Sequence, residues 1–110
     1  MVIVPARQGL EAVDILRLRR GVGPVLHDRA GDTLGFLVPP GTADGWELPG
    51  SVCARGHRRG GGPAGPPLAG AGWLVPPERA YAGVTEPERL RAVLEEAART
   101  IAAAEGPGGG

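Results

Sequence analysis

The sequence predicts an α+β fold, in which a small, mostly antiparallel sheet is covered by two helices and the C-terminal helix is long and amphipathic. Three observations predict it: two apolar runs flank a short turn-forming segment, other short β-branched or aromatic runs end at prolines, and the last part of the chain repeats apolar residues at helical spacing. The predicted strands cover residues 2–4, 24–27, 33–38, 46–48 and 73–75, and the predicted helices cover residues 9–20 and 86–105.

The centre of the pattern is a hairpin between residues 24 and 38. Its two apolar runs are separated by residues 28–32, which read Asp-Arg-Ala-Gly-Asp. Gly31 can adopt positive φ, and the two aspartates can accept hydrogen bonds from nearby backbone N–H groups. A short glycine-containing loop between two β-rich runs predicts an antiparallel pair. Two prolines after residue 38 end the second strand, because proline has no N–H to donate to a neighbouring strand.

The segment before the hairpin predicts a strand followed by a helix. Three β-branched residues at 2–4 favour a buried strand, which Pro5 ends. From residue 9 onward, apolar residues recur at helical spacing, with acidic side chains in the first half and three arginines in the last turn. This order of charges is the one that the helix dipole favours. Gly21 and Gly23 then predict the end of the helix.

Two shorter apolar runs complete the predicted sheet. Residues 46–48 (Trp-Glu-Leu) read as a strand that Pro49 ends, and residues 51–53 can continue it. Residues 73–75 (Trp-Leu-Val) precede a pair of prolines, as residues 36–38 (Phe-Leu-Val) do. In both places, we expect the proline pair to end an apolar strand.

The last helix has the clearest pattern. Thr85 and Glu88 have the spacing of a capping box, in which the threonine hydroxyl and the glutamate carboxylate each accept a hydrogen bond from the other residue's N–H. Further along, Glu95 and Arg99 are spaced for an i, i+4 ion pair. The apolar stripe that this helix would bury consists of Leu90, Val93, Leu94, Ala97, Ala98 and Ile101.

Glycine and proline are abundant, with 20 and 12 residues, but most of the excess lies in two segments. The periodic segments and an apolar fraction of 42% favour a packed core in the rest of the chain. We therefore expect a single small α+β domain over residues 1–105, with a disordered Gly/Pro/Arg loop at about 55–72 and a flexible tail at 106–110.

Charge and composition exclude several classes of protein. The formal net charge is zero, so the chain as a whole has no long-range attraction for nucleic acid or anionic membranes. The only cysteine, Cys53, cannot form an intramolecular disulfide. No apolar stretch approaches the roughly 20 residues of a membrane span, and no signal-peptide pattern is present. These features predict a soluble, cytoplasmic protein with no membrane partner.

Several short motifs together resemble the N-terminal domain of actinobacterial bifunctional DNA primase/polymerases. They are the first strand with Pro5 and Gly9, the start of the hairpin at residues 23–25, Glu47, and the Gly-Trp-Leu-Val-Pro-Pro segment at residues 72–77. The resemblance covers roughly residues 2–80, which correspond to only the second half of a full family domain. It implies a shortened and degenerate copy of that domain.

The family performs two-metal nucleotidyl transfer, and the resemblance implies where its metal ligands would lie in this chain. The first paired acids fall at Ile3 and Pro5, and the strand that carries a histidine falls at Thr33–Phe36, which has none. Only Glu47 lies where an acid is expected, and one carboxylate does not hold a hard cation that needs several oxygen ligands. The resemblance therefore implies an inactive copy with no catalytic residues, no bound metal and no cofactor.

Two other groups of residues could carry chemistry. His27 and Asp28 precede the hairpin turn and Asp32 follows it, so a metal or general-base site is conceivable, but a solvated turn is the simpler interpretation because no further ligands are near in sequence. Cys53 and His57 have a spacing that occurs in zinc sites, yet two ligands are too few. A small, buried, hydrophobic cysteine is the better interpretation of Cys53.

The strongest indication of a ligand is Arg55, Arg58 and Arg59, which lie in a glycine-rich segment. Such segments contact nucleic-acid backbones, which predicts weak, sequence-independent binding of single-stranded nucleic acid; the alternative is a solvated loop. The three arginines that end the first helix allow the same two interpretations. The sequence therefore predicts an inactive primase/polymerase-like module associated with nucleic acid or a protein partner. The alternative is a small structural or interaction protein with no nucleic-acid role.

Overall fold

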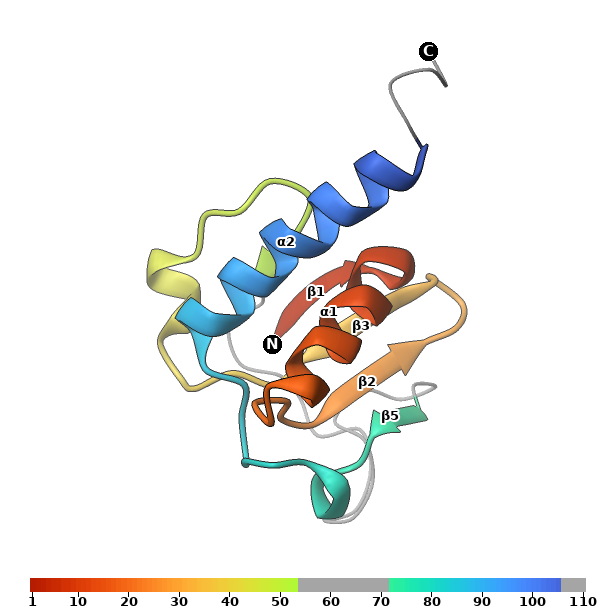
Figure 1. The fold of residues 1–110 in the computed structure, drawn as a ribbon. Coiled ribbons are helices and arrows are strands. Elements are labelled where there is room, and N and C mark those ends of the chain that lie inside the picture. The colour runs from red at the N-terminus through yellow and green to blue at the C-terminus, as the bar shows by residue number, and fades with distance from the viewer. Residues whose placement is uncertain (54–71, 106–110) are drawn as a thin grey trace.

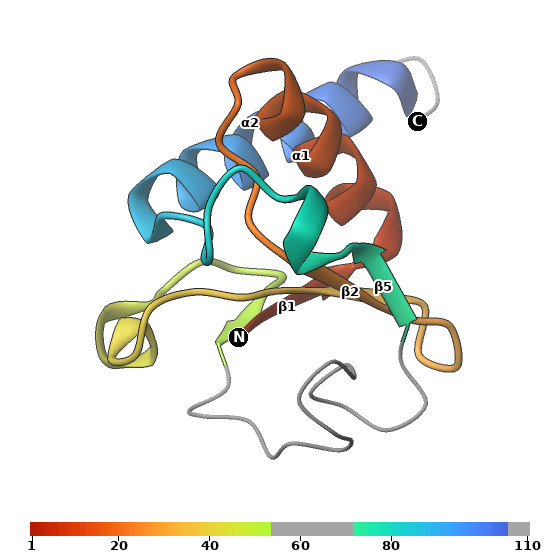
Figure 2. The ribbon, with the colours of Figure 1, turned by 90° about the horizontal axis from the view of Figure 1, so that it is seen from below.

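One antiparallel sheet carries both helices on the same face, which confirms the predicted α+β class (Figures 1 and 2). The structure is a computed structural model, and it describes residues 1–53 and 72–105. The predicted loop at 55–72 therefore lies outside the described residues, apart from Gly72, and so does the predicted tail. The elements are β1 (Val2–Pro5), α1 (Ala6–Leu18), β2 (Val25–Asp28), β3 (Thr33–Phe36), the 3-10 helix η1 (Thr42–Gly45), β4 (Val52–Cys53), β5 (Gly72–Val75), the 3-10 helix η2 (Pro77–Arg79) and α2 (Pro87–Glu105).

The sheet has the strand order β4-β1-β3-β2-β5, and every pairing is antiparallel. The predicted hairpin is confirmed as β2–β3, in which Val25 lies opposite Phe36 and Asp28 lies opposite Thr33. β3 ends at Phe36 rather than residue 38, because Leu37 lies opposite Pro24, which has no N–H to donate to it. The Leu37 N–H donates to the carbonyl of Pro24 and the Leu37 carbonyl accepts from Thr85.

The core lies between the sheet and the helices. Because side chains alternate between the two faces of a strand, Val2 and Val4 point toward the helices, and so do Leu34 and Phe36 of the neighbouring strand. All of them are almost completely buried. The helices contribute Ala12, Val13, Leu16, Leu90, Val93, Leu94 and Ala97, each at most 2% exposed.

The other face of the sheet is also apolar at its centre. Ile3, Gly35 and Leu26 form one row across β1, β3 and β2. Met1 covers Gly35 so closely that a Cβ there would lie 2.6 Å from the Met1 sulfur. Leu26 is buried as well. This row matters for function because it contains Ile3, one of the two positions that the resemblance assigns to metal-binding acids.

Helix α1 begins at Ala6 rather than residue 9. Pro5 directly precedes it with φ −56° and ψ 143°, a conformation that ends the strand and starts the helix. The Ala6 N–H, which has no partner within the helix, donates to the carbonyl of Asp32 in the hairpin turn at 2.9 Å. This hydrogen bond links the start of α1 to the hairpin turn.

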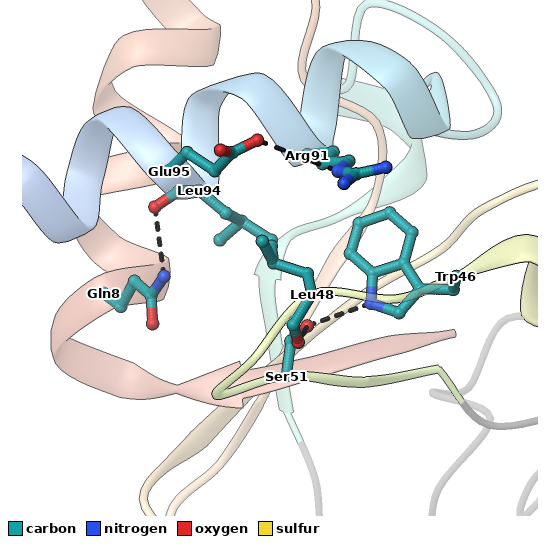
Figure 3. Close-up of polar contacts among 7 residues, drawn as sticks. All are labelled: Gln8, Trp46, Leu48, Ser51, Arg91, Leu94 and Glu95. Atoms are coloured by element: carbon teal, nitrogen blue, oxygen red, sulfur yellow. Dashed lines mark hydrogen bonds and ion pairs between the residues drawn. The ribbon is translucent and has the colours of Figure 1, made fainter.

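The predicted strand at residues 46–48 is wrong. Residues 46–48 lie in a loop that follows η1, and the short edge strand is instead β4, which includes half-buried Cys53. Side-chain hydrogen bonds explain the difference: the Trp46 indole N–H donates to the Ser51 hydroxyl oxygen at 2.9 Å, and that hydroxyl lies 2.9 Å from the Leu48 carbonyl (Figure 3). These bonds close the loop on itself and leave its backbone unpaired with the sheet.

This loop faces α2 directly, with Leu48 pointing toward Leu94 and Gln8 of α1 beside them (Figure 3). The Gln8 amide donates to the carbonyl of Leu94 at 3.0 Å, which joins the two helices directly. On the same stretch of α2, Glu95 pairs with Arg91 at 3.7 Å, rather than with Arg99 as the sequence predicted. Both side chains are about half exposed, so this ion pair contributes little to stability.

Helix α2 begins one residue later than its predicted capping box requires. The Leu90 N–H donates to the carbonyl of Glu86, so Glu86 occupies the N-cap position and Thr85 lies before it. The Thr85 hydroxyl instead accepts a hydrogen bond from the N–H of Gly23 at 2.9 Å, and Thr85 is fully buried. The Thr85 hydroxyl therefore binds Gly23, a residue distant in sequence, and does not cap the helix as the capping-box spacing predicted.

The buried stripe of α2 is shorter than predicted. Leu90, Val93, Leu94 and Ala97 are fully buried, whereas Ala98 is exposed and Ile101 is only partly buried. Figure 1 shows the reason, because the end of α2 extends past α1 and the sheet. Docking of α2 therefore depends on its first half.

We expect Leu94→Ala to lower the free energy of unfolding by about 2–4 kcal/mol, because it removes a fully buried side chain at the contact with α1. Leu18→Ala makes the same chemical change at a side chain that is 86% exposed, and should leave stability nearly unchanged. Thermal and urea denaturation would measure both. Equal effects of the two substitutions would contradict the packing of α2.

We also expect Gly23→Ala to destabilise the fold by about 1–3 kcal/mol or more. A Cβ at this position would lie 2.4 Å from the carbonyl carbon of Val84 and 2.6 Å from the backbone nitrogen of Thr85, and backbone atoms cannot rotate away. Gly45→Ala is the control, since no atom lies within 4 Å of its Cβ position. Urea denaturation that ranks the two variants equally would disprove this close approach.

Candidate nucleic-acid interface

The sequence indicates six arginines that could bind phosphate, and the structure describes three of them, those at the end of α1. Arg55, Arg58 and Arg59 lie outside the described residues, so their role stays a prediction. Arg17, Arg19 and Arg20 are all exposed. The first question is therefore what surrounds the end of α1.

The end of α1 has the hydrogen bonds of a Schellman motif. The Gly21 N–H donates to the Leu16 carbonyl at 2.8 Å, and the Arg20 N–H donates to the Arg17 carbonyl at 3.1 Å. The left-handed residue in such a motif is most often glycine, but here it is Arg20, with φ 54°. A residue with a Cβ is less stable in this conformation, at a cost of about 1–2 kcal/mol. The motif thus places a guanidinium side chain at a position that favours glycine.

Helix α2 adds a fourth arginine to this corner. A Cβ on Gly21 would lie 2.6 Å from the Arg89 Nη1 atom and 3.0 Å from its Cδ, so the Arg89 side chain extends directly across the Gly21 backbone. Arg89 is itself exposed. We call Arg17, Arg19, Arg20 and Arg89 the arginine corner.

Carboxylates partly neutralise the arginine corner. Arg19 reaches across to Glu96 of α2, with its Nη2 3.1 Å from one carboxylate oxygen and 3.2 Å from the other. Two exposed acids, Glu86 and Glu88, lie at the start of α2, close in sequence to Arg89. Arg17, Arg20 and Arg89 are therefore the cations of this corner that Glu96 does not engage.

The chain that enters α2 borders the same corner. The Tyr81 N–H donates to the carbonyl of Val22 at 2.9 Å, directly after Gly21, and the Tyr81 side chain is 57% exposed. In Figures 1 and 2, this connection passes beside the end of α1 before it reaches α2. The backbone of an exposed aromatic residue therefore lies beside the chain that ends α1.

The hairpin residues form a turn. The Asp28 carboxylate accepts hydrogen bonds from the N–H groups of Ala30 and Gly31, at 3.1 and 3.3 Å. His27 is not part of a solvated turn as predicted, because it lies within β2 and is half-buried. Its Nε2 is shielded from solvent and has no hydrogen-bond partner among the residues that the structure describes. Over residues 1–53 and 72–105, no three His, Cys, Asp or Glu side chains gather as a metal site would require.

The two positions that the resemblance assigns to paired metal-binding acids both lie on β1. Ile3 of β1 lies between Gly35 of β3 and Val52 of β4, in the apolar row on the sheet face opposite the helices. Pro5 lies opposite Thr33. Glu47 is exposed in the loop that follows η1. None of the neighbours of Ile3 in this row offers an oxygen ligand from its side chain.

Comparisons with known proteins identify no relative. No protein-family model matches the chain, and neither a curated protein nor a solved structure matches it. No helix in the described part of the chain is long and apolar enough to cross a membrane.

The sequence alone does not indicate that Arg89 belongs to the arginine corner or that Tyr81 borders it. Neither lies in a run of arginines or aromatic residues, and both reach the corner only through contacts with Gly21 and Val22. The available signal is Gly21, the glycine after the arginine run. Glycine at this position predicts the end of a helix, but it also permits close approach of another chain segment.

We expect no template-dependent nucleotide incorporation by this chain with Mg²⁺ or Mn²⁺, because side chains without oxygen ligands occupy positions 3 and 5. A primer-extension assay on the purified chain would measure it. Incorporation that Glu47→Ala abolishes would contradict this expectation and would show that the acids of the site lie elsewhere.

Proposed function

We propose that this chain is a non-catalytic, primase/polymerase-like module of the cytoplasm that binds nucleic acid through its phosphate backbone. The observation that carries the proposal is the arginine corner, in which three exposed arginines at the end of α1 lie near the exposed Arg89 of α2, whose side chain crosses the Gly21 backbone. The loop arginines, Arg55, Arg58 and Arg59, are proposed as a second contact of the same kind.

Guanidinium groups suit this role chemically. Each presents several N–H donors in a plane, which matches two oxygens of one phosphate. The arginine corner is built on the ends of two packed helices, so the backbone that carries it is held in place. Contacts of this kind position a nucleic acid without reading its bases.

The backbone at Arg20 also supports the proposal. A left-handed, non-glycine residue is less stable than glycine would be, and such residues concentrate at binding sites, where the side chain has a role that offsets the cost. Replacement of Arg20 by glycine would relieve the conformation and remove a cation at the same time. This makes Arg20→Gly a variant in which loss of binding cannot be attributed to unfolding.

The affinity should be weak. The chain has no net charge, and Glu86 and Glu88 reduce the positive potential near Arg89. Non-specific binding at physiological salt is typically in the range of about 1–100 μM, and we expect values at the weaker end. About three phosphate contacts on a single strand would make the logarithm of the binding constant fall with the logarithm of salt concentration with a slope near −2.

We expect Arg20→Gly combined with Arg89→Ala to weaken binding of a fluorescent single-stranded oligonucleotide and to reduce the salt slope by about 1 to 1.5, since two phosphate contacts are lost. The control is Arg29→Ala with Arg99→Ala, which removes the same charge from the hairpin turn and the outer part of α2. Fluorescence anisotropy at several salt concentrations would measure both. Equal losses in the two double variants would show that only overall charge matters.

The contribution of the loop can be separated in the same assay. Replacement of Arg55, Arg58 and Arg59 by alanine should weaken binding to all sequences alike, because phosphate contacts carry no base information. If the wild-type chain shows no binding even at low salt, where such contacts are strongest, the nucleic-acid proposal fails.

A second candidate function is binding of an acidic segment of a partner protein. Leu18 favours it, since this leucine is 86% exposed between Arg17 and Arg19. An apolar side chain flanked by cations fits a peptide that has both acidic and apolar residues. Leu18→Ala distinguishes the two functions, because it should leave oligonucleotide binding unchanged and weaken binding of such a peptide.

A further inference from the structure

The connection from η2 to α2 is anchored by its backbone at both ends. Near its start, the Tyr81 N–H donates to the Val22 carbonyl at 2.9 Å. Near its end, the Thr85 N–H donates to the Leu37 carbonyl at 2.8 Å, and the Thr85 hydroxyl accepts a hydrogen bond from the Gly23 N–H at 2.9 Å. The segment is therefore held against the chain that follows α1.

Tyr81 nevertheless leaves most of its side chain in solvent. Its exposed fraction is 57%, and its backbone is fixed by the bond to Val22. A tyrosine side chain has only two rotatable angles, so little entropy is lost when its ring binds a flat partner. The ring is an exposed, apolar, planar surface on a fixed backbone, and packing of the core does not require it.

The backbone of Tyr81 lies close to the backbone of the arginine corner. The Tyr81 N–H is hydrogen-bonded to the Val22 carbonyl. Val22 is two residues from Arg20, so the Cα atoms of Val22 and Arg20 are at most about 7.6 Å apart. Gly21, between them, is the residue that Arg89 covers. The backbones of Arg20 and Tyr81 therefore lie close together, and the Arg89 side chain crosses the glycine that follows Arg20.

From this arrangement, we infer that Tyr81 stacks on an unpaired base, and that the ligand of the arginine corner is single-stranded nucleic acid. The inference rests on the proposed function, because the arginines supply the phosphate contacts that bring the base to the ring. Aromatic side chains beside cationic grooves bind single strands by this combination, with little dependence on sequence. In a duplex, the bases are stacked on one another and do not offer a free face.

The test uses the full chain and three probes with equal numbers of phosphates: oligo(dT), an abasic strand, and a duplex with half as many base pairs as the oligo(dT) has nucleotides. We expect the wild-type chain to bind oligo(dT) most tightly. Tyr81→Ala should weaken oligo(dT) binding roughly fivefold or more, the size of the loss when one stacking contact is removed. Tyr81→Phe, which retains the ring, should bind like the wild type, and neither variant should change binding of the abasic strand.

The outcomes separate this inference from the proposed function. If Tyr81→Ala binds oligo(dT) as the wild type does while Arg20→Gly with Arg89→Ala loses affinity, the stacking role of Tyr81 is overturned and phosphate binding stands. Tighter binding of the duplex than of oligo(dT) would also overturn it. If no probe binds at low salt, both proposals fail. Thermal melts followed by circular dichroism would show that each variant is folded. If Tyr81→Ala has the melting temperature of the wild type, its weaker binding of oligo(dT) is due to loss of the ring.

Discussion

The close approach of Gly23 to the chain before α2 is the constraint on which the other features depend. The Gly23 N–H binds the buried Thr85 hydroxyl, and the backbone of residues 84 and 85 fills the space that a Cβ would need. This contact sets where α2 begins, and therefore where its buried stripe meets α1. It also brings Tyr81 and Arg89 to the end of α1, so the core and the candidate site share one structural cause.

The end of α1 illustrates how stability and binding can compete within one turn. Glycine at position 20 would suit the left-handed conformation, and glycine at position 21 leaves room for the Arg89 side chain that lies over it. The chain has glycine only at the second position. Arginine at the first position lowers the stability of the turn, and the phosphate contact that we propose for Arg20 would offset this cost.

The fold could be predicted from the sequence wherever local pattern and tertiary structure agree. The hairpin and α2 are such cases, because their turn residues and apolar spacing already specify the pairing and the buried side. The strand expected at residues 46–48 failed because Trp46 and Ser51 close a loop with their side chains, which strand propensity does not consider. The capping box failed for a related reason, since Gly23 engages the Thr85 hydroxyl. Arg89, the one member of the arginine corner that comes from α2, could not be predicted, because its proximity to Gly21 is a property of the folded chain alone.

The strand order has a consequence for the chain as it is synthesised. β1 is made first but lies inside the sheet, between β3 and β4, so its second edge stays unpaired until residue 53 is available. The N–H of Gly23 waits longer, since its partner is Thr85. Among the described strands, only the β2–β3 hairpin joins two that are adjacent in sequence. A nascent chain can therefore form its hairpin early and pack α1 against it, but the side of α1 that packs against α2 stays exposed until α2 has left the ribosome, and this places a period of aggregation risk before α2 is complete.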